Sequence, residues 1–145
     1  MNVSGTIDAI LNQKSGDIWT VSPDETVYDA IKLMAEKNVG ALLVMEGEKI
    51  VGMVTERDYA RKVVLQGRSS ATTPVRDIMS APVITASPAD TVEHAMRLMT
   101  DRRIRHLPVV RGEAVVGVVS IGDLVRSIID AQRSTIEALQ SYIQG

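Results

Sequence analysis

The chain has 145 residues, of which 45% are hydrophobic and 23% charged, enough for one ordinary domain or two very small ones with a shared aliphatic core. Its 16 basic and 18 acidic residues leave a net charge of -2 without a dense basic run, which argues against nucleic acid as a primary partner. It has no cysteine, no basic-then-apolar leader and no long apolar stretch, so we expect a cytoplasmic protein that does not span a membrane.

The first predicted helix lies in "SPDETVYDAIKLMAEKN". Ser22 is expected to be its N-cap, Pro23 its first residue, and Glu25 the partner in a capping box. A stripe of apolar residues at helical spacing predicts one buried face: Val27, Ala30, Ile31 and Met34.

Two aliphatic runs, "ALLVM" and "IVGMV", follow around a short polar turn and predict a β-hairpin. Because both runs are continuously apolar, we expect strands that are covered on both faces, with a helix after Thr55 as one cover. The segment from Leu65 to Asp77 is rich in small polar residues and contains Gly67 and Pro74, which predicts a linker.

The same series of elements then recurs. Thr20 to Asp58 aligns with Thr85 to Asp123 without a gap, and sixteen residues recur unchanged. The unit is therefore strand, helix, strand, strand, helix, and it occurs twice. Each copy alone would bury too little surface, so we expect the two sheets to pack together and complete the core. The tail from Ile121 to Gln144 predicts a long amphipathic helix, broken once at most, that packs on a partner subunit or back on the chain.

A hydroxyl and an aspartate follow the last strand of each copy, as Thr55 with Asp58 and as Ser120 with Asp123. This spacing is that of a capping box, which requires no ligand. The same position, where a strand turns into a helix, also attracts anions, and an aspartate there can accept two hydrogen bonds from the vicinal diol of a ribose.

The order of motifs resembles a pair of CBS domains (cystathionine β-synthase domains, forming a Bateman module) over about residues 5 to 130. The resemblance rests on "DIWTVSPDETVYDAIKLMAEKNVGALLV" with "GMVTERD", and on "DIMSAPVITASPADTVEHAMRLMTDRRIRHLPVV" with "GVVSIGD". It is closest to small stand-alone bacterial proteins of two CBS repeats. It implies an α/β (α+β) fold of two β-α-β-β-α repeats with pseudo-two-fold symmetry and packed sheets. We expect the chain to be divided into repeat 1 at 5–66, a linker at 67–76, repeat 2 at 77–130 and a helical extension at 131–145.

The resemblance implies that adenine nucleotides or related adenosyl ligands (AMP, ADP, ATP, NAD or NADH) bind in two clefts between the repeats, with no cofactor required. In the first cleft Asp58 would hold the ribose, residues around Val83, Ile84 and Ile104 the adenine, and charged residues the phosphate. Its members are Thr55, Arg57, Asp58, Met79, Val83, Ile84, Ile104, Arg105 and His106. Those of the second cleft are Lys14, Trp19, Val39, Gly40, Ala41, Ser120 and Asp123.

The two clefts differ in charge, because Gly40, Ala41 and Gly122 stand where the other copy has Arg105, His106 and Arg57. Cations facing phosphate form hydrogen bonds of about 1.5–3 kcal/mol, so we expect the Asp58 cleft to fill first. Lys14 could partly compensate in the other cleft. The two histidines, without cysteine, give little support to a metal site, and Trp19 could belong to the core or to the second cleft.

No nucleophile with a base, paired carboxylates or metal cluster is visible, so we do not expect an enzyme. The leading interpretation is a regulatory energy sensor whose adenylate occupancy is transmitted to an unidentified protein partner. The alternative is an interaction or dimerisation module with vestigial clefts. The resemblance also implies a homodimer, a disc of four repeats, with Val63, Val64, Val125 and Ile129 as both interface and core.

Overall fold

The computed structural model describes residues 5–14 and 16–144, and the chain divides into two compact units. One unit is the continuous stretch Asp17–Ile84, and the other combines the N-terminal segment up to Gly16 with the chain from Thr85 onward. The compact units therefore do not coincide with the repeats as they are divided along the sequence. Among the described residues, none of the helices has the length and apolar character needed to cross a bilayer.

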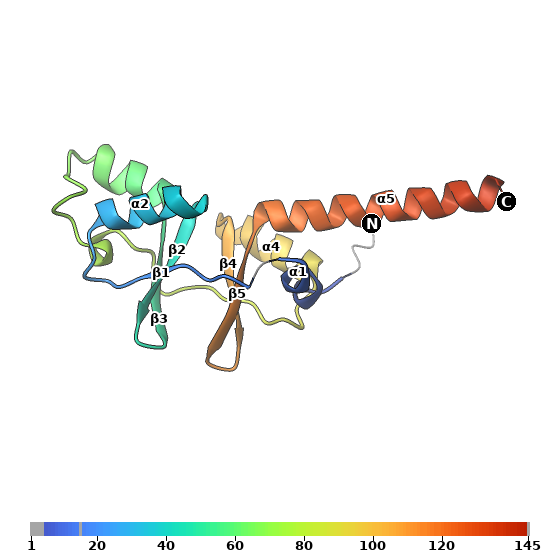
Figure 1. The fold of residues 1–145 in the computed structure, drawn as a ribbon, viewed down its shortest axis with the longest axis horizontal. Coiled ribbons are helices and arrows are strands. Elements are labelled where there is room, and N and C mark those ends of the chain that lie inside the picture. Colours follow the sequence, from blue (N-terminus) through green and yellow to red (C-terminus); the bar gives the residue numbers. More distant parts are fainter. Residues whose placement is uncertain (1–4, 15, 145) are drawn as a thin grey trace. The chain divides into compact units, whose positions relative to one another are not determined.

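The unit Asp17–Ile84 confirms the predicted α/β class and the order strand, helix, strand, strand, helix (Figure 1). Strand β1 (Thr20–Val21) pairs in parallel with β2 (Ala41–Glu46), which forms an antiparallel hairpin with β3 (Lys49–Thr55). Helix α2 (Val27–Lys37) connects β1 to β2, and α3 (Glu56–Tyr59) follows β3. A π-helical turn η1 (Ala60–Val64) continues α3, and a 3-10 turn η2 (Val75–Asp77) lies further along.

The core of this unit is aliphatic, as the composition predicts. The predicted stripe of α2 packs against the sheet, with Ile31 only partly buried, and η1 and the segment around η2 also contribute residues. Its fully buried members are Val27, Ala30, Met34, Leu42, Val44, Val54, Val63, Val75 and Ile78.

The residues predicted as a linker, 67–76, are packed on α2. The N–H of Val27 donates to the carbonyl oxygen of Thr73 (2.9 Å), and the N–H of Tyr28 donates to that of Ser70 (3.0 Å). In the other direction, the N–H of Val75 donates to the carbonyl oxygen of Glu25 (2.8 Å). Thr73 and Val75 are buried. This connecting segment therefore supplies part of the core. Its carbonyl groups also accept hydrogen bonds from the N–H groups at the start of α2, which have no partner within the helix.

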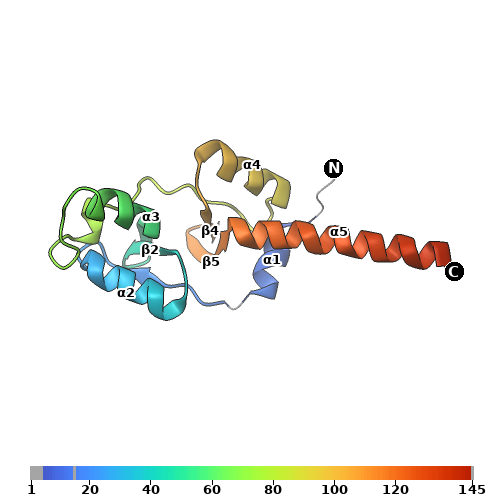
Figure 2. The same cartoon turned by 90° about the horizontal axis from the view of Figure 1, so that it is seen from above.

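The other unit contains the hairpin of β4 (His106–Arg111) and β5 (Ala114–Ser120), with α4 (Val92–Arg102) before it. Its first strand is reduced to a single parallel bridge between Ala86 and Val109. Helix α5 (Ile121–Gln144) follows β5 without a break, and α1 (Ile7–Gln13), which the sequence did not predict, contacts both β5 and α5 (Figures 1 and 2).

Helices α2 and α4 begin later than predicted, and Ser22 is not the N-cap of α2. The side chain of Thr26 accepts from the N–H of Asp29 and caps α2, and Thr91 caps α4 in the same way. The Ser22 N–H donates to Glu25 Oε2 at 2.6 Å, and the Glu25 N–H to the Ser22 carbonyl at 3.3 Å. These contacts close a turn before the helix, so the Ser-Pro-Asp-Glu signal marks an entry turn and the next threonine starts the helix.

A repeated glycine in the outer strand of each hairpin allows a neighbouring side chain to lie directly on the backbone. A Cβ at Gly52 would lie 2.6 Å from Met79 Sδ and 3.1 Å from the carbonyl oxygen of Ser80. At Gly117 a Cβ would lie 2.6 Å from Leu11 Cδ2. The segment 78–80 and helix α1 thus cover β3 and β5 respectively, and the recurrence of glycine has a packing reason.

We predict that Gly52→Ala lowers the free energy of unfolding by about 1–3 kcal/mol, because the added methyl group overpacks Met79 and Ser80. Gly117→Ala should cost less, since the leucine side chain that it meets can rotate. Gly16→Ala is the control, because nothing lies within 4 Å of the added carbon. Urea denaturation of the three variants tests the order; equal stability of Gly52→Ala and the wild type would contradict it.

Candidate functional site

The two hydroxyl and aspartate pairs lie where the last strand of each hairpin turns into a helix. Asp58 Oδ2 accepts from the Thr55 N–H (3.0 Å) and the Thr55 hydroxyl (3.1 Å), and the Asp58 N–H donates to Thr55 Oγ1 (3.0 Å). Ser120 and Asp123 exchange the corresponding backbone bonds at 2.8 and 3.1 Å. Both pairs are therefore reciprocal capping boxes, as the spacing predicts, and each leaves a carboxylate fixed at a helix N-terminus.

Asp58 is only 7% exposed, and a lysine neutralises its charge. Lys62 Nζ lies 3.1 Å from Asp58 Oδ1 and donates to the Ile78 carbonyl at 2.9 Å. The lysine side chain remains nearly half exposed. The sequence reasoning missed Lys62, although its spacing of four residues from Asp58 on a helix is a recognisable signal.

Asp123 is paired with Lys14, which comes from the segment after α1. Lys14 Nζ lies 2.6 Å from Asp123 Oδ2 and donates to the Val118 carbonyl at 2.9 Å, while Arg126 is 3.5 Å from Oδ1. Burial raises the pKa of the Asp123 carboxyl, but the hydrogen bonds from Lys14 and Ser120 and the lysine charge outweigh burial and lower the pKa below its ordinary value. Lys14 thus binds Asp123, and both residues are predicted members of the second cleft.

The unit Asp17–Ile84 holds ten of the predicted residues. Ala41 pairs with Thr55, and the Gly40 carbonyl accepts from the Glu56 N–H at 3.1 Å, so the start of β2 adjoins the Asp58 capping box. The ring of Trp19 packs against the core, with Lys37 Nζ 4.4 Å from its centroid. The full set in this unit is Thr55, Arg57, Asp58, Met79, Val83 and Ile84 from the first cleft, and Trp19, Val39, Gly40 and Ala41 from the second.

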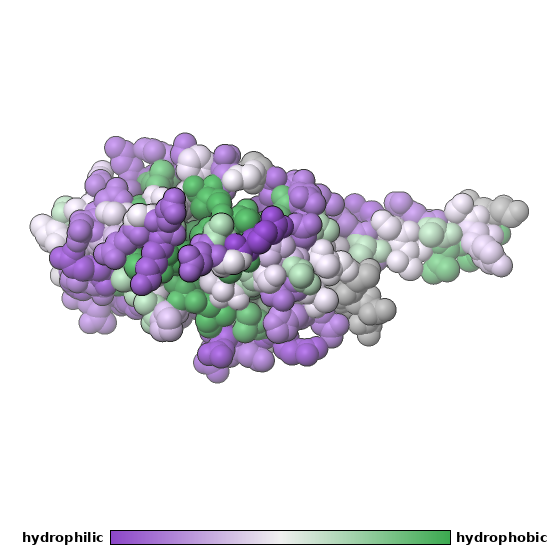
Figure 3. Space-filling view, turned by 90° about the horizontal axis from the view of Figure 1, so that it is seen from below, coloured by the Kyte–Doolittle hydropathy of each residue, from purple (hydrophilic) through white to green (hydrophobic). Residues whose placement is uncertain are grey.

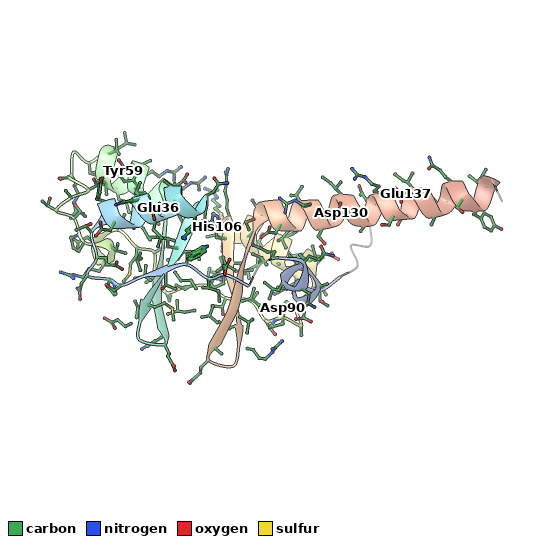
Figure 4. All side chains as sticks on the ribbon, viewed as in Figure 1. Glu36, Tyr59, Asp90, His106, Asp130 and Glu137 are labelled. Carbon is green, nitrogen blue, oxygen red and sulfur yellow. The ribbon has the colours of Figure 1, made fainter. Side chains whose placement is uncertain are left out.

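The remaining predicted residues belong to the other unit. His106, at the start of β4 (Figure 4), pairs with Ser120, and the Arg105 carbonyl accepts from the Ile121 N–H at 2.8 Å. Arg105 is exposed. Each unit therefore places the start of its first hairpin strand beside its own capping box, and each predicted cleft draws on residues of both units: Ile104, Arg105 and His106 for the first, and Lys14, Ser120 and Asp123 for the second.

A different depression lies at the tip of the β4–β5 hairpin. Thr6, Asp8, Ser87, Pro88 and Arg111 are among the residues that line it, and none of the predicted ligand-binding residues does. Arg111 lies 3.8 Å from Asp8 across it. In the described parts of the chain, no three His, Cys, Asp or Glu side chains are grouped to hold a metal ion.

Comparison with known proteins identifies the repeat. A model of the CBS domain family matches residues 11–65 and 75–130. The mitochondrial CBS domain-containing protein CBSX3 of Arabidopsis thaliana is 46% identical over 152 residues, which cover 98% of this chain and 73% of the relative.

Two solved structures share the fold. A protein with CBS domains from Burkholderia ambifaria MC40-6 has a TM-score of 0.86 and 53% identity, over 88% of this chain and 96% of that one. The CBS domain pair of protein MJ0100, solved in complex with 5-methylthioadenosine and S-adenosyl-L-methionine, has a TM-score of 0.74 and 29% identity, over 84% of this chain and 94% of that one.

We predict that Lys14→Met raises the pKa of Asp123 and lowers the free energy of unfolding at pH 7 by about 0.5–1 kcal/mol. The wild-type pKa is lowered in the folded state, so the pair stabilises the protein above the unfolded pKa of about 4 and loses this effect as the pH falls through the folded value.

The difference between Lys14→Met and the wild type should therefore shrink between pH 7 and pH 3 in urea denaturation. Lys49→Met, at an exposed position in the β2–β3 hairpin, is the control. A loss of stability that is the same at both pH values would contradict a role through the charge of Asp123.

Proposed function

The chain belongs to the CBS domain family, whose paired domains are regulatory modules, and we propose that it is a non-catalytic sensor of an adenine nucleotide or related adenosyl ligand. The observation that carries the proposal is the largely buried carboxylate at each junction of strand and helix, fixed by a capping box. We further propose that ligand occupancy is transmitted to a protein partner, and that the protein acts in the cytoplasm.

An aspartate held in this way suits a ribose. A carboxylate accepts hydrogen bonds from two neighbouring hydroxyls, and the helix N-terminus favours the negative groups of a nucleotide. The ligands bound to protein MJ0100, 5-methylthioadenosine and S-adenosyl-L-methionine, contain the same adenosine that AMP, ADP, ATP, NAD and NADH carry. Adenosine is therefore the part of the ligand that we expect the protein to recognise.

A ribose can reach Asp58 by replacing a single partner. Oδ2 is used by Thr55, whereas Oδ1 is bound by the flexible, nearly half-exposed Lys62. If the diol takes the place of the lysine on Oδ1, the carboxylate keeps its capping bonds and the released ammonium group remains available for phosphate. The helix start therefore does not have to unfold for ligand to bind.

The other members of the first proposed site follow the roles that the family resemblance implies. Main-chain groups and side chains around Val83, Ile84 and Ile104 hold the adenine, and Met79 belongs to the same proposed site. The phosphate is met by polar and charged side chains, namely Thr55, Arg57, Arg105 and His106.

The second proposed site, around Ser120 and Asp123, is the weaker of the two. Lys14 lies 2.6 Å from Asp123 Oδ2 and Arg126 lies 3.5 Å from Oδ1, so a diol has to compete with two cationic side chains, whereas Asp58 has Lys62 at 3.1 Å. Lys14 is thereby less available for phosphate. The Asp58 site should fill first.

The alternative function, a protein-interaction module with vestigial sites, is favoured by one observation. Both carboxylates are already satisfied by capping bonds and a lysine, so neither needs a ligand for stability. This alternative predicts a well-folded protein that binds no adenine ligand.

We also propose that the protein is a homodimer that associates through α3–η1 and the start of α5. Of the residues expected at this interface, Val63 is buried in the core of its own unit, whereas Val64, Val125 and Ile129 are exposed. The exposed three present apolar surface that association would remove from water.

We predict that nucleotide-free protein binds at least one of AMP, ADP, ATP, NAD, NADH and S-adenosylmethionine, and that Asp58→Ala weakens this binding at least tenfold by isothermal titration. The reason is the loss of charge-assisted bonds to the ribose, each worth about 1.5–3 kcal/mol. Asp123→Ala should weaken the tighter binding event much less.

Asp90→Ala is the matched control, because Asp90 Oδ2 accepts from the Ser87 N–H at 2.8 Å in the same kind of turn but lies outside both proposed sites. It should leave affinity unchanged. If none of the six ligands binds to protein with a cooperative unfolding transition, the sensor function is wrong and the interaction module stands.

A further inference from the structure

Helix α5 extends well beyond the part of its unit on which it packs (Figure 1). Its first half contacts α1, α4 and β5 through Leu124, which is fully buried, and through the half-buried Ile128 and Ala131. From residue 132 to residue 143 every side chain is exposed. A projecting helical segment of this length is marginal in water without a partner.

A second apolar stripe runs along α5 on a different face. Val125 and Ile129 are exposed on the first half, and Ile136 (55%), Leu139 (57%) and Ile143 (80%) are exposed on the projecting half. In Figure 3 green, hydrophobic atoms lie among white and purple ones along this distal part of the helix. The stripe begins one residue, or about 100° around the helix, from the buried Leu124, so the face that packs on the unit cannot also bury it.

The spacing of this stripe alternates between four and three residues, which is the repeat of a coiled coil. The seam residues are Val125, Ile129, Gln132, Ile136, Leu139 and Ile143. In heptad terms, isoleucine occupies all three a positions (129, 136 and 143), and the d positions are Val125, Gln132 and Leu139. β-Branched residues at a with leucine at d favour two parallel strands, a combination that Ile136 and Leu139 supply, and Gln132 places one polar layer in the seam.

We propose that α5 pairs with α5 of a second copy as a parallel, in-register, two-stranded coiled coil along this seam. A second copy fits because the seam is self-complementary: under two-fold symmetry each layer meets its own residue, so the two Gln132 amides face each other. The seam begins with Val125 and Ile129, which also belong to the proposed association through the start of α5, and continues it along the projecting half of the helix. The pairing does not depend on the proposed ligand.

The charges beside the seam favour the parallel orientation. In a fully overlapping antiparallel pair, Val125 would pack on Ile143 and Gln132 on Ile136, which brings the two copies of Arg133 together near the centre. In the parallel pair Arg133 faces a position held by the uncharged Ile128. Like charges are therefore juxtaposed only in the antiparallel arrangement.

Disulfide trapping tests the pairing directly, because the chain has no cysteine of its own. In Leu139→Cys the two thiols meet across a d layer, and mild oxidation should give a covalent dimer in most of the protein. Ser141→Cys, on the outer face of the same turn, should give little. An antiparallel pair would place the introduced thiol opposite Ile129 of the second copy, so failure of Leu139→Cys to cross-link beyond Ser141→Cys overturns the proposal.

A second pair of variants tests whether the seam contributes to association. Ile136→Asp with Leu139→Asp puts two charges into the seam, and we expect the dimer dissociation constant, measured by sedimentation equilibrium on the full chain, to rise at least tenfold. Ser134→Asp with Ser141→Asp adds the same charge to the outer face and should change it less than twofold. An unchanged dissociation constant in the seam variant overturns the proposal, whatever the result for nucleotide binding.

Discussion

Both units depend on a covering side chain that rests on a glycine in the outer strand of a hairpin. Hairpins of this size cannot bury both faces by themselves, so each must obtain a cover from elsewhere in the chain. Met79 covers Gly52 and Leu11 covers Gly117, so each cover segment lies at the start of one repeat in the sequence and covers the hairpin of the other. This requirement explains why the compact units exchange segments relative to the order of the repeats. The strands fixed in this way end at Thr55 and Ser120, so the same packing positions the two capping boxes.

Each capping box fixes a largely buried carboxylate whose cationic partner can be exchanged. Each aspartate keeps its backbone bonds while a lysine supplies the third partner, so a ligand can compete for one bond without dissolving the helix start. Such competition changes structure only if the ligand binds two arrangements differently. At Asp123 the competing lysine ties the segment after α1 to the first turn of α5. Displacement of Lys14 would therefore loosen the base of the helix that carries the coiled-coil seam.

The sequence predicted what depends on local pattern or on duplication. The two hairpins, the long C-terminal helix and the capping geometry of Asp58 and Asp123 follow from apolar runs, helical spacing and the S/T-x-x-D motif, and the structure has them. The predicted start of α2 was wrong, because serine and threonine can both cap a helix and the turn closed by Glu25 leaves that role to Thr26. Helix α1, the packed segment 67–76 and the lysines on the aspartates were missed, since each depends on contacts between residues distant in sequence or on a side-chain rotamer. The ligand sites themselves stay predictions.

The exchange of segments also sets an order of events during synthesis. Residues 17–84 form one continuous unit and can fold as soon as they have left the ribosome. Helix α1 precedes them in the chain and cannot pack yet, because the strand and helix that it contacts, β5 and α5, are translated after residue 84. During that interval Ile7 and Ile10, both buried in the folded protein, have no packing partners from β5 or α5. A nascent chain stalled before β5 should therefore be a better chaperone substrate than its folded first half alone would suggest.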